Sequence, residues 1–197
     1  MAGVRRTSTG CAWYVGIPGA GKTTLAVSHL ARDAAANRWP AVVLDSSDVA
    51  QLAHVPHVAN VDELAAAVWE RGEHVALVPR DGAEVERVCD LVLRLRRVNL
   101  LVDEAAFWIS SNKGRDSSLL RLMRAHRHAQ ARLYLTTQHL SADVPQAALS
   151  CAPELFVFRC TSPVVLERLE REFAIDPELV RELPRGSFIR HTTGFSY

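Results

Sequence analysis

The chain has 197 residues, a length that favours a single domain. Its share of apolar residues, 48%, is sufficient for a substantial buried core. The formal net charge of +1 excludes a generally basic protein that coats nucleic acid. Any contact with DNA or RNA must therefore come from a local patch or from several subunits acting together.

Short apolar runs typical of buried strands alternate with helical patterns. In chain order we predict a strand at 11–15, a helix at 22–36, a strand at 41–45, a helix at 61–71, a strand at 74–79, a helix at 83–97, a strand at 99–103, a helix at 116–130, strands at 132–137 and 155–160, and a helix at 163–173. Residues 1–10 form an N-terminal arm, and 186–197 have the pattern of a β-hairpin or edge strand. Strands buried on both faces and joined by helices indicate a mostly parallel α/β sheet, with 1–197 as one domain.

The cysteines and histidines lack the spacing of a metal site, so we predict no zinc and interpret the cysteines as buried thiols in a reducing compartment. No apolar run approaches the roughly 18 residues that a membrane helix needs. The polar N-terminus lacks the apolar segment of a signal peptide. We therefore expect a soluble intracellular protein that does not itself span a membrane.

A glycine-rich segment follows the first predicted strand. Residues 16–23 fit the pattern G-x-x-x-x-G-K-[ST] and precede an amphipathic helix, as a phosphate-binding loop requires. Glycines let successive N–H groups point at the phosphates, and the helix N-terminus adds partial positive charge. We expect Lys22 to reach the β- and γ-phosphates, Thr23 to ligate Mg²⁺ and Thr24 to support the α-phosphate. The predicted nucleotide-binding residues are Gly16, Ile17, Pro18, Gly19, Ala20, Gly21, Lys22, Thr23 and Thr24.

Two acidic residues, Asp103 and Glu104, close the apolar run of the strand at 99–103. Asp103 matches a Walker B carboxylate that holds Mg²⁺. Glu104 is in position to polarise an attacking water. A small-molecule kinase positions a substrate hydroxyl and does not need a water-activating glutamate there, so the pair favours hydrolysis.

The strand at 132–137 is followed by Gln138. In P-loop ATPases with a catalytic glutamate, a further strand lies between the P-loop strand and the Walker B strand, and its tip carries a polar residue beside the γ-phosphate. Gln138 has that place in sequence order, and an amide can both donate and accept hydrogen bonds. We predict that Gln138 senses the γ-phosphate and contacts the attacking water, and that Lys22, Glu104 and Gln138 are the catalytic residues.

These motifs resemble the FtsK–HerA superfamily of DNA-translocating ATPases, and within it the small genome-packaging ATPases of membrane-containing icosahedral viruses of bacteria and archaea. The resembling segments are GIPGAGKTT, NLLVDEA and RLMRAHRHAQARLYLTTQHLSADVPQAALSCAPELFVFRC. The last segment has the family's order of a basic helix, a strand ending in T-Q, a nearby proline, a short helix and a final strand. The resemblance implies a three-layer P-loop NTPase fold (RecA/ASCE-like), with ATP and Mg²⁺ as cofactors.

The resemblance also implies an ATP-hydrolysing translocase of double-stranded DNA, serving as a viral genome-packaging motor. The implied partners are double-stranded DNA, further copies of the chain in a pentameric or hexameric ring, and packaging proteins at the capsid vertex or inner membrane. The implied location is the host cytoplasm during assembly, or the virion. Lys113 and Arg115, in the polar stretch 110–117, and Arg80 are candidate DNA-facing residues.

In such rings one subunit completes its neighbour's site, so the resemblance implies a trans-acting arginine. Arg124 and Arg127 are the first candidates and Arg121 the next, because they recur at helical spacing before the strand at 132–137. The chain departs from the family where T-Q-R-P is expected, since His139 follows Gln138. The role of that basic residue therefore does not carry over.

Three other interpretations stay open. A P-loop kinase of a nucleotide or metabolite would transfer phosphate to a small acceptor without stimulation by DNA. A phage assembly or export ATPase of the Zot-like type would carry a membrane segment. A regulatory nucleotide-binding module would not hydrolyse ATP, and in it Glu104→Gln would leave activity at background.

Overall fold

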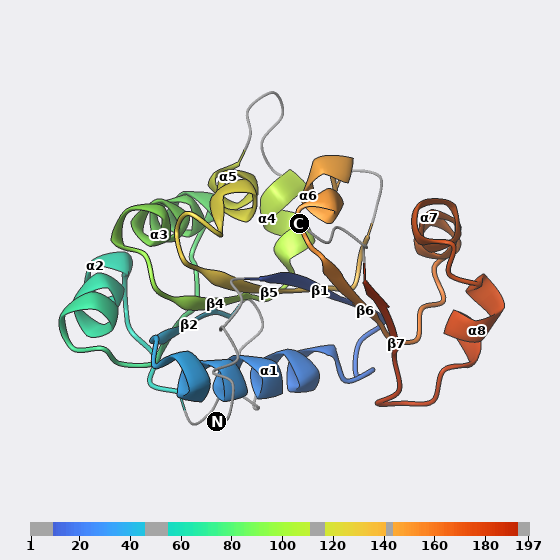
Figure 1. Cartoon of the computed structure of the whole chain (residues 1–197), viewed down its shortest axis with the longest axis horizontal. Coiled ribbons are helices and arrows are strands. Elements are labelled where there is room, and N and C mark those ends of the chain that lie inside the picture. Colours follow the sequence, from blue (N-terminus) through green and yellow to red (C-terminus); the bar gives the residue numbers. More distant parts are fainter. Residues whose placement is uncertain (1–9, 46–54, 111–116, 141–143, 193–197) are drawn as a thin grey trace, which may run out of the picture.

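The computed structural model describes residues 10–45, 55–110, 117–140 and 144–192. The centre of the molecule is one sheet, which Figure 1 shows edge-on. Within these residues its strands are β1 (Cys11–Val15), β2 (Ala41–Leu44), β3 (Val75–Leu77), β4 (Asn99–Val102), β5 (Arg132–Thr137), β6 (Glu154–Val157) and β7 (Ile189–Thr192). Their order across the sheet is β3-β2-β4-β5-β1-β6-β7. Neighbouring strands are parallel except β6 and β7. The predicted mostly parallel sheet is confirmed.

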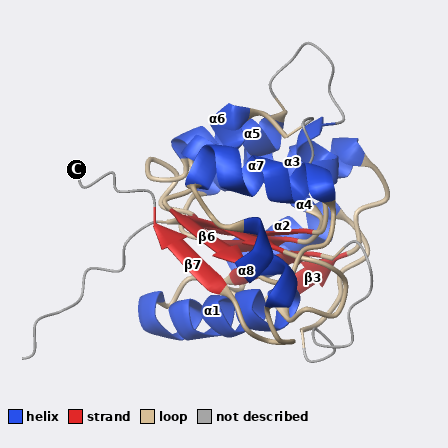
Figure 2. Cartoon of the chain, turned by 90° about the vertical axis from the view of Figure 1, so that its right-hand side faces the viewer, coloured by secondary structure: helices blue, strands red, loops and turns tan. Residues whose placement is uncertain are grey.

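Helices cover both faces of this sheet. They are α1 (Lys22–Asn37), α2 (Val61–Ala65), α3 (Gly82–Leu95), α4 (Ala105–Ser110), α5 (Ser118–Ala125), α6 (Gln146–Ser150), α7 (Pro163–Phe173) and α8 (Pro177–Glu182). Figures 1 and 2 show α1 below the sheet and α3, α4, α5 and α6 above it. Helices α7 and α8 lie beside the edge formed by β7 (Figure 1). The predicted three-layer α/β arrangement is confirmed.

Strand β1 shows why its sequence is continuously apolar. Trp13 and Val15 pack into the core beneath the upper helices. Ala12 and Tyr14, on the other face, pack with residues of α1 such as Leu30. Because both faces of the strand are buried, no position along it is left for a polar residue.

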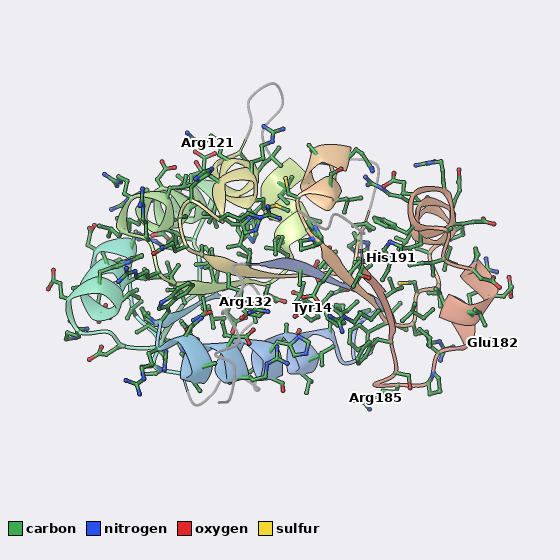
Figure 3. The ribbon with its side chains drawn as sticks, in the orientation of Figure 1. Tyr14, Arg121, Arg132, Glu182, Arg185 and His191 are labelled. Carbon is green, nitrogen blue, oxygen red and sulfur yellow. The ribbon has the colours of Figure 1, made fainter. Side chains whose placement is uncertain are left out.

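A buried carboxylate fixes α1 to the sheet. Asp33, on α1, accepts a hydrogen bond from the Tyr134 hydroxyl of β5 at 2.8 Å. The Arg132 guanidinium, at the start of β5, lies 2.9 Å from the same carboxylate oxygen, between the sheet and α1 in Figure 3. Satisfied polar clusters of this kind specify one arrangement of the elements they join.

Two predicted helices differ from those observed. The predicted helix 61–71 is α-helical only over α2 and continues as a π-helical segment, Ala66–Glu70. The predicted helix 116–130 ends at Ala125, and the turns that follow close with Gln130 at a φ of +49°. A backbone in this left-handed region cannot continue a helix, so the chain turns there towards β5.

Other differences concern short elements. The predicted strand 155–160 ends at Val157, and α4, α6 and α8 have no counterpart among the helices predicted from periodicity. Helices of five or six residues are too short to show a 3.6-residue repeat. Helix α8 does carry a start signal, because the Asp176 side chain caps its first turn and Pro177 follows.

Buried thiols are observed at Cys11, Cys89 and Cys160, as predicted, whereas Cys151 is partly exposed. Over the described ranges, no helix is both long enough and apolar enough to cross a membrane. The N-terminal arm up to residue 9 and the end of the tail from residue 193 lie outside those ranges.

Candidate nucleotide-binding and hydrolysis site

The glycine-rich loop between β1 and α1 is held against the neighbouring strands by its own backbone. The Gly16 N–H donates to the Thr137 carbonyl at the end of β5 (3.2 Å). The Ile17 N–H donates to the Arg159 carbonyl just beyond β6 (2.9 Å). A Cβ on Gly16 would lie 2.7 Å from the Cβ of Phe158, closer than packed atoms approach. Glycine is therefore required for the loop to pass this close to β6.

The other glycines bend the loop into the start of α1. Gly19 and Gly21 have φ values of +71° and +110°, which favour glycine. No side chain caps the helix at Gly21, and α1 begins at Lys22. The first N–H groups of a helix have no partner within it, so here they are available to an anion.

Lys22 is buried at the entry to α1, with 6% of its surface exposed. Its Nζ donates to the Ile17 carbonyl at 3.0 Å. Burial lowers the pKa of Lys22, while the negative charges of Glu104 and Asp103 partly oppose that shift. Burial deprives the Lys22 ammonium of contact with water. A negatively charged phosphate oxygen beside Nζ would stabilise the ammonium in its place.

The two predicted acids follow β4 and are held by one residue of β5. The Thr136 hydroxyl donates to Asp103 Oδ1 at 2.5 Å and accepts from the Glu104 N–H at 3.3 Å. Both Thr136 and Asp103 are buried. Glu104 has a φ of +48°, an uncommon conformation for a residue with a side chain. Uncommon backbone angles persist where surrounding contacts fix them, and Thr136 supplies such a contact.

The tip of β5 orients the Glu104 carboxylate. Glu104 Oε2 accepts a hydrogen bond from the Gln138 N–H at 3.2 Å and a weaker one from the Thr137 hydroxyl at 3.4 Å. Strand β5 pairs with β4 on one side and with β1 on the other, as predicted. This order brings Gln138 between the acids and the glycine-rich loop.

These elements enclose a cavity of about 760 Å³ at the carboxyl ends of the parallel strands. This edge is where ligands bind in open α/β sheets. The lining residues are Pro18, Gly19, Gly21, Lys22, Thr23, Thr24, Leu25, Ser28, Asp103, Glu104, Gln138, Phe158, Arg185, Gly186 and Phe188. The cavity thus brings together predicted residues from three separate segments. Gly16, Ile17 and Ala20 do not line it and instead shape the loop behind it.

The donor set in the cavity fits a magnesium ion. The Thr23 hydroxyl and the Asp103 carboxylate are hard oxygen ligands, and both side chains line the same cavity. Mg²⁺ is commonly held in proteins by one or two such groups together with substrate phosphates. These residues are therefore suited to hold the ion beside a nucleotide.

Solved structures share this fold. The genome packaging NTPase B204 from Sulfolobus turreted icosahedral virus 2, in complex with ATP-gammaS, matches with a TM-score of 0.77 and 17% identity, over 93% of this chain and 92% of that one. B204, the DNA-packaging ATPase from Sulfolobus turreted icosahedral virus, gives 0.69 and 15%, over 93% and 97%. The chain has a P-loop NTPase fold. The predicted fold class and the resemblance in fold to viral packaging ATPases are confirmed.

A further solved structure is longer than this chain, so that the match covers only part of it. It is the pCW3 conjugation coupling protein TcpA, monomer form with ATPgS, with a TM-score of 0.65 and 14% identity, over 95% of this chain and 58% of that one. No family model and no curated protein matches the sequence.

One wall of the cavity is absent from the sequence prediction. It consists of Arg185, Gly186 and Phe188, from the turn before β7. Because β7 runs antiparallel to β6, the start of β7 lies at the edge where the parallel strands end. The Gly186 N–H donates to the Ala20 carbonyl at 3.0 Å, which joins this wall to the loop. The tail has no phosphate motif; its strand pattern is the one signal that could have pointed to it.

The arginines predicted to act on a neighbour's site are not among the residues that line the cavity. Arg121 lies on the opposite side of the sheet from Arg185 (Figure 3) and forms an ion pair with Asp90 of α3 at 3.2 Å. Arg124 and Arg127 are exposed, on α5 and on the turn after it. Their role in a neighbouring subunit stays a prediction.

The candidate DNA-facing residues have different settings. Arg80 forms an ion pair with Glu84 on the first turn of α3, and most of its side chain is exposed. Lys113 and Arg115 lie outside the described residues.

A second hollow adjoins the nucleotide cavity. It has a volume of about 440 Å³ and shares Glu104 and Gln138 with that cavity. Phe107, which is 64% exposed, and Trp108 form one side of it, and their rings meet edge to face at a centroid distance of 4.8 Å. His139 lines it as well.

Proposed function

We propose that the protein is an ATPase that couples ATP hydrolysis to the translocation of double-stranded DNA during the packaging of a viral genome. The observation that carries this proposal is the convergence of Lys22, Glu104 and Gln138 on one cavity. Strand β5, which leads to Gln138, lies between β4, which leads to the acids, and β1, which leads to the glycine-rich loop. The likeness in fold and in length to viral packaging NTPases supports the DNA-moving role.

Each residue has a distinct chemical part in this proposal. Lys22 and the first N–H groups of α1 bind the triphosphate. Mg²⁺ held by Thr23 and Asp103 supplies positive charge to the phosphate oxygens when bound. The Glu104 carboxylate, fixed by the tip of β5, orients the attacking water and accepts its proton. The Gln138 amide bridges that water and the γ-phosphate.

The proposal includes a homo-oligomeric ring, pentameric or hexameric, around the DNA. A modest net charge of +1 per chain suits a ring, because each subunit then needs few contacts with DNA phosphates. Arg124 and Arg127, which are both exposed, are the first candidates to complete a neighbour's site, and Arg121 is the next. A guanidinium beside the γ-phosphate would stabilise the charge of the transition state.

The remaining partners follow from the same role. We propose a single ATPase domain over 1–197 that engages packaging proteins at the capsid vertex or inner membrane. It would act in the host cytoplasm during assembly or remain with the virion.

One observation favours a second candidate function, a P-loop kinase. The hollow beside Glu104 and Gln138 is large enough for a small acceptor, with a volume of about 440 Å³. A hydroxyl bound there could take the place of the attacking water, with Glu104 as its base. The two functions differ in the acceptor of the γ-phosphoryl group and in their response to DNA.

Phosphate release from Mg-ATP, measured with and without linear double-stranded DNA, separates them. We expect DNA to raise the turnover of the wild type, Glu104→Gln to lose both rates, and Glu182→Gln, exposed at the end of α8, to keep both. Equal rates with and without DNA, together with phosphoryl transfer to a nucleoside monophosphate, would contradict the proposal and support the kinase.

A further inference from the structure

The nucleotide cavity has two chemically different ends. Strand order places the ends of β4 and β5, with Asp103, Glu104 and Gln138, on one side of the glycine-rich loop. The end of β6 and the start of β7, with Phe158 and Phe188, lie on the other side. The first end carries charge and amide groups suited to phosphate chemistry. The second end presents two aromatic rings together with the turn that carries Arg185.

Phe188 is the exposed member of an aromatic cluster. Its ring lies 5.6 Å from that of Phe156, edge to face, and 5.4 Å from that of Phe158. Phe156 in turn stacks on Tyr14 at 4.9 Å, with nearly parallel planes. The Phe188 side chain is thus supported by the sheet, yet the residue remains 40% exposed and lines the cavity. The cluster leaves part of an aromatic ring facing the space that a nucleotide would occupy.

The wall that carries Phe188 is fixed relative to the phosphate loop. The Gly186 N–H bonds to the Ala20 carbonyl, and the Ser187 N–H bonds to the Pro184 carbonyl, both at 3.0 Å. A Cβ on Gly21 would lie 3.4 Å from both Gly186 Cα and the Phe158 ring. The N–H groups of Gly186 and Ser187 are therefore already hydrogen-bonded within the protein. Arg185, from the same turn, and Ser28 of α1 also line the cavity.

We propose that Phe188 stacks on the base of the bound nucleotide, and that this end accepts adenine and guanine with little discrimination. Every base has a π-face, so stacking on an aromatic side chain tolerates a change of base. Strong discrimination requires buried polar groups that would be left unpaired by the wrong ligand. Among the residues that the structure describes, the engaged N–H groups of the turn and the polar side chains of Ser28 and Arg185 do not form such a buried set. The proposal rests on the nucleotide site of the proposed function.

Equilibrium binding of ATP-γ-S, GTP-γ-S and inorganic tripolyphosphate, each with Mg²⁺, tests it on the full chain. Phe188→Leu keeps an apolar side chain against the aromatic cluster but removes the aromatic face. We expect it to weaken both nucleotides by about tenfold and to leave tripolyphosphate, which has no base, unchanged. Phe188→Tyr retains wild-type affinity. Phe173→Leu, a matched control that contacts His191 of β7 away from the cavity, changes none of the three.

Three results would overturn the inference. Unchanged nucleotide affinity in Phe188→Leu would mean that no base stacks there. An equal loss of tripolyphosphate would mean that Phe188 only supports the loop. A preference of the wild type for one nucleotide by more than about a hundredfold would mean that the base is read by hydrogen bonds. Failure of the DNA-moving role would appear instead as turnover that DNA does not change, with these affinities intact.

Discussion

The phosphate-loop wall of the cavity and its acidic wall are built in different ways. The phosphate-loop wall belongs to one continuous segment, residues 16–24, whose geometry comes from its own glycines and from the start of α1. The acidic wall consists of Asp103, Glu104 and Gln138, which follow the ends of β4 and β5. Thr136 of β5 holds the two acids, and the Gln138 N–H donates to Glu104. We expect the first wall to supply most of the contacts with a triphosphate and the second to supply the carboxylate for hydrolysis. Binding and hydrolysis should therefore fail separately when each wall is altered.

The largest effect is expected on the acidic wall. Glu104→Gln keeps the size of the side chain but removes the carboxylate that accepts a proton, so turnover of ATP should fall by about 10²–10⁴-fold. The affinity for ATP should stay within a few-fold of that of the wild type. Single-turnover hydrolysis and equilibrium binding measure the two quantities. A parallel loss of both would show that the two walls do not act separately.

The next effect is expected on the phosphate-loop wall. Lys22→Met replaces the buried ammonium with an apolar chain of similar length, and ATP affinity should fall by about a hundredfold because a charge-assisted contact with phosphate is lost. Thermal unfolding should show the variant still folded. An affinity unchanged from the wild type would remove Lys22 from the site.

The pH dependence of binding sharpens the same test. Burial lowers the pKa of Lys22 from its ordinary value of 10.5, so the empty site loses its proton at a lower pH than a free lysine. Only the protonated form attracts phosphate, so ATP affinity should decline as the pH rises. Because the pKa is lowered, this decline should start at a pH below 10.5. Titration calorimetry of the wild type should show this decline, and Lys22→Met should lack it.

A smaller effect on stability is expected where the phosphate-loop wall meets β6. Gly16→Ala would place a Cβ 2.7 Å from Phe158 Cβ, and relieving that overlap should cost about 2 kcal/mol of unfolding free energy. Gly82→Ala is the matched control, because a Cβ there meets nothing within 4 Å. Urea denaturation compares the two variants, and equal stabilities would refute the close packing of the loop.

The smallest effect is expected at the residue that joins the two acids. Thr136→Val preserves shape but leaves Asp103 Oδ1 and the Glu104 N–H without the hydroxyl, which should cost about 1–2 kcal/mol and reduce turnover. Thr136→Ser keeps the hydroxyl and should retain both properties. If the valine and serine variants behave alike, the hydroxyl does not organise the acidic wall.

The two walls also differ in how far the sequence reveals them. The phosphate-loop wall is local, so its glycine spacing predicts both the turn and the helix start. The acids and Gln138 could be predicted as separate strand ends, and their meeting follows from β5 lying between β4 and β1. The hydroxyl of Thr136 could not be assigned a role, because its partners are more than thirty residues away.

The wall formed by Arg185, Gly186 and Phe188 escapes prediction for a related reason. It depends on β7 pairing antiparallel with β6, which brings the start of the last strand to the ligand-binding edge. A sequence pattern indicates a strand there but not its direction. Likewise α4 and α8, with six residues each, are too short for a helical repeat to be visible.

In the proposed function, hydrolysis at the acidic wall moves the protein along double-stranded DNA. The most direct measurement is the displacement of a triplex-forming oligonucleotide from a linear duplex. The wild type with Mg-ATP should displace it, whereas Glu104→Gln with Mg-ATP, or the wild type with ATP-γ-S, should leave it bound. Rapid ATP hydrolysis by the wild type on that duplex with the triplex intact would contradict the proposed DNA-moving role.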